Sequence, residues 1–346
     1  MSPLDTPLHF LAQVGLSLVP VFMFLTALIY LDSYKLVNIK SILGTIGFGC
    51  LAAGASWYIY DAVASHAMMD AAAYARYGAP ILEETMKASY LFYLIRARRV
   101  GFMVDAAIQG FALGAGFALV ENVYYLGSLH ETNLLVWIIR GFGTAIMHGG
   151  ATAIVGVVSK NLVDVKNSTS LLMFIPGIVA AVIIHSLFNH LIPASALGSV
   201  TTTALTVIAV PALMLAAFTR SERATRDWLG VGFDNDAELL TMITTGGISM
   251  TRIGQYLDSI QNKFPGEAVV DMLCYLRLHL ELAIQAKGIL LMRESGFTVD
   301  PDANVQAKFD EMTYLQKSIG KTGLLALSPF LRTSNRDLWQ MHMLKR

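Results

Sequence analysis

Long apolar stretches dominate the first two thirds of this chain of 346 residues and restrict the folds open to it. A helix needs about 20 mostly apolar residues to cross a bilayer. The first stretch is too long for a signal-peptide core and no Lys or Arg precedes it, so we expect it to remain in the protein. The third stretch is short and begins with two acids. The pattern predicts an all-α, polytopic membrane bundle of about seven transmembrane helices, at roughly 8–31, 42–64, 78–95, 103–127, 133–158, 171–192 and 199–219.

Charge divides the chain into two parts. Residues 1–219 contain 20 of the 50 Asp, Glu, Lys and Arg residues, whereas the shorter part, 220–346, contains 30. The second part therefore has the charge content of an ordinary soluble domain, about 25%, and its apolar residues recur near the helical period. We predict a transmembrane domain at 1–219 and a helical domain at 220–346. The net charge of zero predicts no nucleic-acid partner, and two cysteines, one in each part, exclude a disulfide framework.

Basic residues predict the orientation in the membrane. Every second loop is rich in Lys and Arg, beginning with the loop after the first stretch, while the alternate loops at 65–77, 128–132 and 193–198 contain one Arg, Arg76. Cytoplasmic loops carry the excess of Lys and Arg. We therefore expect the N-terminus outside and the C-terminal domain in the cytoplasm, on the side of Lys35, Lys40, Arg96, Arg98, Arg99, Lys160, Lys166, Arg220, Arg223 and Arg226.

The third apolar stretch contains three ionisable residues, Glu83, Glu84 and Lys87. Charges inside a bilayer are costly, which makes such residues functional candidates. Lys87 lies at helical spacing from both acids, but one Lys cannot neutralise two carboxylates. One carboxylate must find another partner or hold a proton, and two carboxylates in different environments can do acid and base chemistry. The alternative is a purely structural ion-pair cluster.

Three later stretches contribute further polar side chains. Glu121 has no basic neighbour in its own helix, so it must pair across helices, for example with Arg140, bind a metal or be protonated. His148 lies among glycines, and His185 shares a helical face with Asn189, four residues on. Such a pair can donate hydrogen bonds to an oxyanion or join two helices. At about 1.5 Å per residue, Glu84, Glu121 and His185 lie at similar depths in the outer half and His148 deeper, at roughly 20 Å.

This ordered set resembles the PrsW-type intramembrane proteases, relatives of the CAAX prenyl endopeptidases and bacteriocin-processing proteins. The matching motifs are Glu83-Glu84-Thr85-Met86-Lys87, Phe117 to Glu121 with Asn122, His148, and His185 with Asn189. The resemblance covers about residues 75–195. It implies hydrolysis of a membrane-anchored protein, such as an anti-sigma factor, near the outer half of a bacterial inner membrane.

The resemblance also implies roles for these residues. By analogy with the relatives, Glu83 rather than Glu84 would be the general base, although helix geometry alone leaves both open. Glu121 and His148 would orient the water, and Lys87 would hold the Glu pair. His185 and Asn189 would stabilise the oxyanion.

The need for a metal stays open, because relatives have been described both as metalloproteases and as metal-free glutamate proteases. The chain has no His-Glu-x-x-His motif, yet two His and one Glu can form a catalytic zinc site with water as the fourth ligand. The candidates for one zinc ion are Glu84, Glu121, His148 and His185. No serine- or aspartyl-protease signature competes. The rival interpretations are a proton-coupled transporter and a pseudoprotease scaffold, and the C-terminal domain has room for a cytoplasmic partner.

Overall fold

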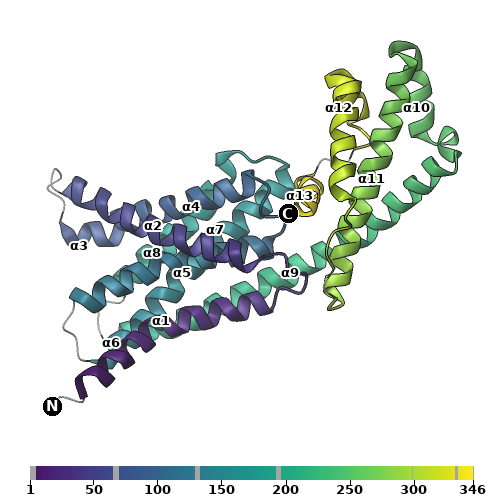
Figure 1. Cartoon of the computed structure of the whole chain (residues 1–346). Coiled ribbons are helices and arrows are strands. Elements are labelled where there is room, and N and C mark those ends of the chain that lie inside the picture. Colours follow the sequence, from purple (N-terminus) through teal and green to yellow (C-terminus); the bar gives the residue numbers. More distant parts are fainter. Residues whose placement is uncertain are drawn as a thin grey trace. The chain divides into compact units, whose positions relative to one another are not determined.

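The computed structural model is helical throughout the residues that it describes, which are 5–64, 70–128, 133–191, 196–297, 299–331 and 334–345 (Figure 1). Parts of the three loops poor in basic residues, namely 65–69, 129–132 and 193–195, lie outside these residues. The chain divides into two compact units, Met1–Ser221 and Glu222–Arg346, and the division falls within helix α9. We describe each unit by itself.

The first unit is a bundle of long helices with two short π-helical turns among them. The π-helical turns are η1 (Tyr74–Gly78) and η2 (Ile139–Thr144). The α-helices are α1 (Asp5–Tyr30), α2 (Ile39–Ala64), α3 (Ala71–Ala73), α4 (Ala79–Arg96), α5 (Met103–Ser128), α6 (Leu134–Ile138), α7 (Ala145–Lys166), α8 (Ile175–Leu191) and the first part of α9 (Ala196–Thr244).

Among the described residues, six helical segments are long and apolar enough to cross a membrane, which supports an integral, multi-pass membrane protein. They correspond to six of the seven predicted stretches, and are Phe10–Tyr30, Ile39–Ala62, Met103–Gly127, Leu134–Lys166, Leu171–Leu191 and Leu197–Thr244. The remaining stretch, the third at 78–95, forms α4, whose 18 residues include Glu83, Glu84, Lys87 and Arg96. These charged residues make α4 less apolar than the six segments, so a seventh membrane crossing remains a prediction.

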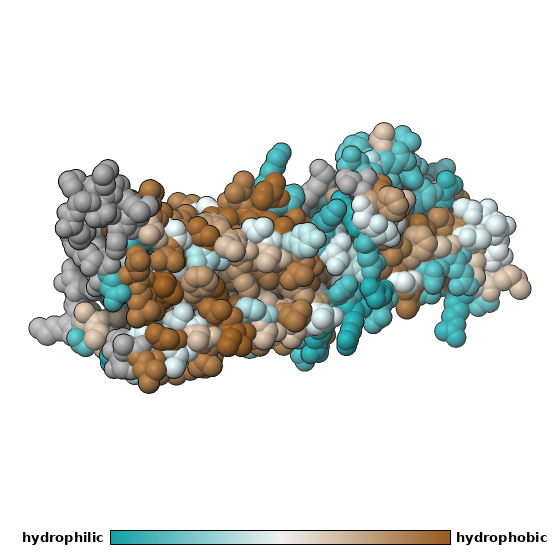
Figure 2. Space-filling model, turned by 90° about the horizontal axis from the view of Figure 1, so that it is seen from below, coloured by the Kyte–Doolittle hydropathy of each residue, from teal (hydrophilic) through white to brown (hydrophobic). Residues whose placement is uncertain are grey.

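The surface of the first unit is rich in apolar side chains (Figure 2). Large residues on several helices are more than half exposed, among them Ile81, Leu187, Leu205 and Ile208. A soluble monomer rarely exposes apolar patches of this extent. This surface is therefore suited to contact with lipid.

Helix α5 lies at the centre of the first unit, and almost all of its apolar segment, Met103–Gly127, is buried. It packs against α7 through small residues. The Cα atoms of Gly110 and Gly114 lie so near the backbone around Thr152 and His148 that an added Cβ would come within 2.6 and 2.3 Å of their carbonyl oxygens. Two glycines one turn apart permit such an approach. This contact sets the position of the polar side chains on both helices.

The buried Asp105 closes the other end of α5. Its carboxylate accepts hydrogen bonds from the backbone N–H groups of Gly101, Phe102 and Ala106. The N–H groups of Gly101 and Phe102 lie just before the helix, and an acid in the first turn can reach back to such donors. These backbone hydrogen bonds give Asp105 a structural role at the start of α5.

The second unit packs around α11 (Gly266–Glu294), with α12 (Val305–Leu327) and α13 (Asn335–Leu344) against it. A shorter helix, α10 (Arg252–Ile260), joins the same apolar core. Lys287 forms a buried ion pair with Asp236 inside this unit. The side chain of Ser334 caps α13 together with Asp337, which forms a capping box.

Candidate active site

Helix α4 places Lys87 against Glu84, and Glu83 forms no ion pair with this lysine. The Lys87 Nζ atom lies 2.6 Å from Glu84 Oε1, and both side chains are fully buried. The same ammonium lies 4.6 Å from the ring centroid of Phe117 on α5, within range of a cation–π interaction. Of the two pairs that helical spacing allows, the structure forms only the one three residues apart. Glu83 is the carboxylate that the lysine does not neutralise.

His148 on α7 connects this pair to α5. Its Nδ1 atom lies 3.2 Å from Lys87 Nζ, and its Nε2 atom lies 2.8 Å from Glu121 Oε2. A lysine ammonium only donates, so Nδ1 accepts and Nε2 carries the proton that is donated to Glu121. The number of residues from the expected helix end predicted that His148 lies deeper in the membrane than Glu84, Glu121 and His185. The structure instead brings it into the same cluster. The helical segment Leu134–Lys166 is much longer than one crossing needs, so distance from its end overstates depth.

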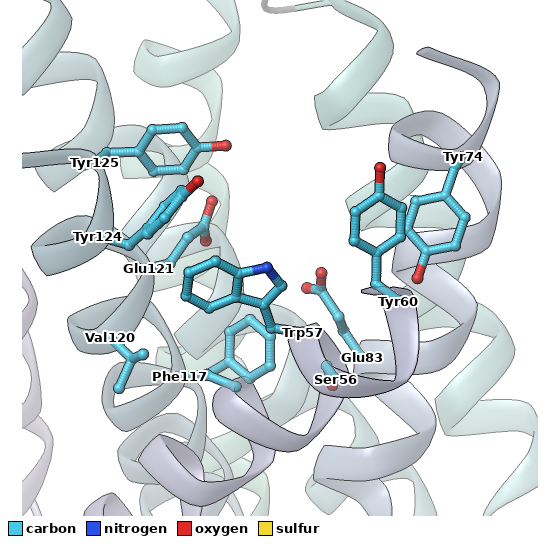
Figure 3. A pocket seen from close by; sticks show the side chains of 11 residues that line it. Ser56, Trp57, Tyr60, Tyr74, Glu83, Phe117, Val120, Glu121, Tyr124 and Tyr125 are labelled. Carbon is cyan, nitrogen blue, oxygen red and sulfur yellow. The ribbon is translucent and has the colours of Figure 1, made fainter. Parts of the chain in front are cut away.

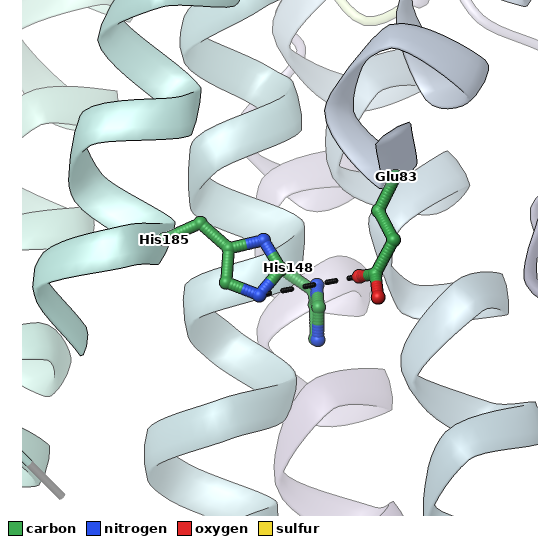
Figure 4. A group of neighbouring side chains, drawn as sticks. All are labelled: Glu83, His148 and His185. Carbon is green, nitrogen blue, oxygen red and sulfur yellow. Dashed lines mark ion pairs between the residues drawn. The ribbon is translucent and has the colours of Figure 1, made fainter. Parts of the chain in front are cut away.

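His185 on α8 faces both acids of α4. Its Nδ1 atom lies 2.9 Å from Glu84 Oε1, and its Nε2 atom lies 3.9 Å from Glu83 Oε2 (Figure 4). The rings of His185 and His148 meet edge to face at 4.7 Å between centroids. Glu84 is thus held by Lys87 and His185, and its Oε2 atom is buried with no hydrogen-bond partner in the described part of the chain. The Glu83 side chain keeps 19% of its surface exposed.

Glu121 has a cation of its own across the helix interface. Arg140, from η2, places Nη2 3.1 Å from Glu121 Oε1 and Nε 3.1 Å from Asn122 Oδ1. Its guanidinium lies 3.6 Å from the ring centroid of Tyr125. Of the options that the sequence left open, Glu121 adopts pairing across helices. The cluster therefore contains three carboxylates and two fixed cations, Lys87 and Arg140.

The structure does not bring Asn189 into this cluster. Its amide Nδ2 donates a hydrogen bond to the carbonyl of Ala75 in η1, at 2.8 Å. Ser186 does the same with the carbonyl of Arg76, at 2.6 Å. This face of α8 holds η1, the turn that leads into α4. For an oxyanion role, Asn189 has either its second amide N–H or the one now bound to Ala75.

A pocket of about 300 Å³ opens beside the cluster (Figure 3). Both Glu83 and Glu121 reach it, and most of its wall is aromatic. Phe117 belongs to the motif found in the sequence, but the other aromatic residues were not predicted, although those of α2 recur at helical spacing on one face and those of α5 do so around Glu121. The lining residues are Ala53, Ser56, Trp57, Tyr60, Tyr74, Glu83, Phe117, Val120, Glu121, Tyr124 and Tyr125.

Three of the clustered side chains suit a metal ion. Glu83, His148 and His185 each offer a ligand atom, and these atoms lie within 4.8 Å of one another. Two imidazoles and a carboxylate form the donor set of many catalytic zinc sites, so the ligand types of this group are those that zinc prefers. His148 would have to release Lys87 or Glu121 to join. The carboxylate of this group is Glu83, which was absent from the ligands expected from the sequence; Glu84 is occupied by Lys87 and His185, and Glu121 by Arg140 and His148.

A cluster of carboxylates and histidines, enclosed by membrane helices and open to a pocket, supplies the groups that a membrane-embedded hydrolase uses to activate water. Comparison with protein families identifies the class more closely. The profile of the PrsW family, described as intramembrane metalloproteases, matches residues 37–216, just over half of the chain, and the chain belongs to this family. It is accordingly a peptidase of the membrane. No match was found among curated proteins or among solved structures.

Proposed function

We propose that the protein hydrolyses a peptide bond of a membrane-anchored protein, with Glu83 as the general base that activates water. The supporting observation is the division between two neighbouring carboxylates. Glu84 is fully buried and held by Lys87 and His185, whereas Glu83 faces the pocket with no lysine beside it. A general base must reach the proton that it removes and must have a free lone pair. Glu83 meets both conditions.

The other side chains of the cluster fix the geometry around Glu83. Glu84 orients His185 through Nδ1, as a buried carboxylate orients the histidine of a catalytic triad. With its proton on Nδ1, His185 presents the lone pair of Nε2 toward Glu83, where a water molecule could donate a hydrogen bond to it. Glu121 and His148 form the opposite side of the same space, and Arg140 keeps the Glu121 carboxylate in place.

The charges of the cluster favour uptake of one positive charge. Its three carboxylates face two fixed cations, and an uncompensated charge away from water is costly. A proton that Glu83 takes from water neutralises this carboxylate, and its negative charge passes to the attacking oxygen and then to the oxyanion. Glu83, His148 and His185 would hold a zinc ion, which would act as a Lewis acid toward water and the scissile carbonyl.

The ends of the helices support a site in the outer half of the bilayer. Glu83 lies near the start of α4 and Glu121 near the end of α5, while the Lys- and Arg-rich loops join the opposite ends of these helices. By the positive-inside rule those loops face the cytoplasm. We therefore propose α4 as a seventh crossing, an external N-terminus and a cytoplasmic unit 222–346. The resemblance favours a bacterial inner membrane and a membrane-anchored regulator, such as an anti-sigma factor, as substrate.

The test is cleavage of a single-span reporter by the purified protein in lipid vesicles. Glu83→Gln, Glu84→Gln and His185→Ala should abolish cleavage, because each removes the base or its support. Asp61→Asn, at the exposed end of α2, is the matched control and should cleave normally. Full activity in all three site variants would contradict the assignment, and wild-type failure on reporters with short and long outer segments would favour a scaffold or transporter.

Metal content is measured on the same preparations. Stoichiometric zinc in the wild type, lost in His148→Ala and His185→Ala and in Glu83→Gln, would support a site made by these three residues. Retention of zinc in all three variants would exclude them as its ligands. Glu83-dependent cleavage that resists a chelator would support glutamate-activated water without a metal.

A further inference from the structure

We propose that the aromatic pocket beside Glu83 binds an aromatic side chain of the substrate next to the scissile bond, and that Trp57 and Tyr124 set this preference. The inference rests on the proposed function, because it places the substrate at the same site. It adds the chemical class of residue that the enzyme selects.

Two pairs of aromatic rings flank Glu83 (Figure 3). On one side, the rings of Trp57 and Tyr124 meet edge to face, with centroids 4.4 Å apart and planes at 67°. On the other side, Tyr60 and Tyr74 lie with centroids 4.4 Å apart. The carboxylate therefore lies between two aromatic walls that come from α2, η1 and α5. A substrate side chain that enters this space brings its own peptide group to Glu83.

The walls suit a further ring better than an aliphatic side chain. Edge-to-face and offset contacts between rings stabilise by about 0.5–1.5 kcal/mol beyond the burial of apolar surface. Trp57 is 52% exposed and Tyr124 is 44% exposed, so both retain surface for such contacts. The pocket, at about 300 Å³, lies at the lower end of the roughly 300–1,000 Å³ range of ligand sites. It has room for one large side chain rather than a folded segment.

A polar group in the pocket favours a ring with a polar edge. Ser56 is 5% exposed, lines the pocket and has no hydrogen-bond partner for its hydroxyl among the residues described. The hydroxyl of a tyrosine or the indole N–H of a tryptophan can supply that partner. Both residues are enriched where membrane helices meet the interface, and the pocket lies toward the ends of α2 and α5. The tyrosine and tryptophan rings of single-span substrates are therefore expected at about the depth of this pocket in the membrane.

The charges of the site disfavour a basic side chain in the pocket. Aromatic walls with two carboxylates are chemically able to bind a cation, but Arg140 already lies against Tyr125 and pairs with Glu121. A lysine of the substrate would be left with Glu83. It would pair with the general base and suppress the reaction that the pocket serves.

The experiment compares two reporters in one vesicle, so that loss of folded enzyme cancels in the ratio of their cleavage rates. The scissile bond is first located by mass spectrometry, and each residue beside it is changed in turn to Tyr, Phe, Leu, Ala or Lys. At one of these positions, Tyr and Phe should give kcat/KM at least about tenfold above Ala, the factor that about 1.4 kcal/mol of ring contact produces. Lys should be cleaved least.

Variants of the pocket then assign the preference. Trp57→Ala and Tyr124→Ala should each bring the Phe:Ala ratio toward one, while Trp57→Phe should preserve most of it. Ser56→Ala should lower the Tyr:Phe ratio and leave the Phe:Ala ratio unchanged. The matched control is Tyr58→Ala, since Tyr58 follows Trp57 on α2, is 78% exposed and does not line the pocket.

Three results would overturn the inference: equal cleavage of aromatic and Ala reporters by the wild type, a wild-type ratio in Trp57→Ala and Tyr124→Ala together, or a preference for Lys. Glu83→Gln separates this failure from failure of the proposed function. If Glu83→Gln is inactive while the reporters are cleaved equally, only the aromatic subsite is wrong. If Glu83→Gln cleaves normally, the proposed function itself is wrong.

Discussion

The contact between α5 and α7 allows a sharp test of how the active site is held. Gly114 on α5 packs against the backbone of His148 and Gly149, and a Cβ added at Gly114 would lie 2.3 Å from the His148 carbonyl oxygen. Real Cβ atoms essentially never come within 3.0 Å of such an atom. The substitution Gly114→Ala therefore has to separate the two backbones by at least about 0.7 Å, the difference between these distances. The residue displaced is His148 itself.

The displacement is large on the scale of the site. If it fell along the bond from His148 Nε2 to Glu121, the distance would grow from 2.8 to about 3.5 Å, where most of a hydrogen bond is lost. Overpacking of this kind costs about 1–3 kcal/mol of stability, and a misplacement near 1 Å can lower a rate about 10²-fold. We expect Gly114→Ala to insert and fold, to be destabilised by that amount, and to cleave the reporter about 10- to 100-fold more slowly.

Gly127→Ala is the matched control for this experiment. Gly127 lies on the same helix, and a Cβ added there meets nothing within 4 Å. The control should keep wild-type activity and gain slightly in stability, since Ala is favoured over Gly in a helix by about 0.5–1 kcal/mol. Stability is measured by SDS titration and cleavage in vesicles. Wild-type cleavage by Gly114→Ala, with Gly127→Ala unchanged, would show that the close approach of α5 and α7 does not position the site.

Three further predictions concern single side chains. Lys87→Met should lower the stability in SDS by about 3–5 kcal/mol, because it leaves the Glu84 charge buried without its cation; an unchanged midpoint would contradict the buried ion pair. Asn189→Ala should reduce cleavage by about tenfold or less, as expected for one lost hydrogen bond to η1, whereas a loss of 10²–10³ in kcat would indicate an oxyanion donor instead. Burial, followed by the weaker effect of Lys287, lowers the pKa of His279 below its ordinary value of 6.5; the unfolded chain then binds the proton more readily, so the stability of unit 222–346 should fall as pH drops below about 6.5, and His279→Leu should flatten that slope in calorimetry.

The sequence predicted the membrane helices well because the bilayer imposes a simple requirement on them. Six of the seven apolar stretches form long apolar helices, and the exception, α4, is the stretch that carries the charged motif. The charged residues of α4 lower its mean hydropathy below that of the six. The π-helical turns η1 and η2 were not predicted, because an extra residue in a helical turn leaves no pattern in composition.

The ionisable members of the polar cluster were also predictable, but Asn189 lies outside it and several pairings within it were not predicted. Spacing put Lys87 near both Glu83 and Glu84, and only the packing of His185 and His148 around them determines which acid the lysine holds. The aromatic pocket escaped notice because its residues come from α2, η1 and α5. Taken singly, each of them resembles an ordinary interfacial aromatic residue.

The division between Glu83 and Glu84 follows from helix geometry and connects the fold to its chemistry. Successive residues on a helix point about 100° apart, so two adjacent acids at the edge of a buried face cannot share one environment. Glu84 points between α7 and α8, where Lys87 neutralises it and His185 forms a hydrogen bond with it, and Glu83 points toward α2 and the pocket. A pair of carboxylates next to each other in sequence thereby supplies one anchored charge and, in the mechanism that we propose, one reactive base. In that mechanism a single lysine is enough, because a second cation at Glu83 would suppress the base.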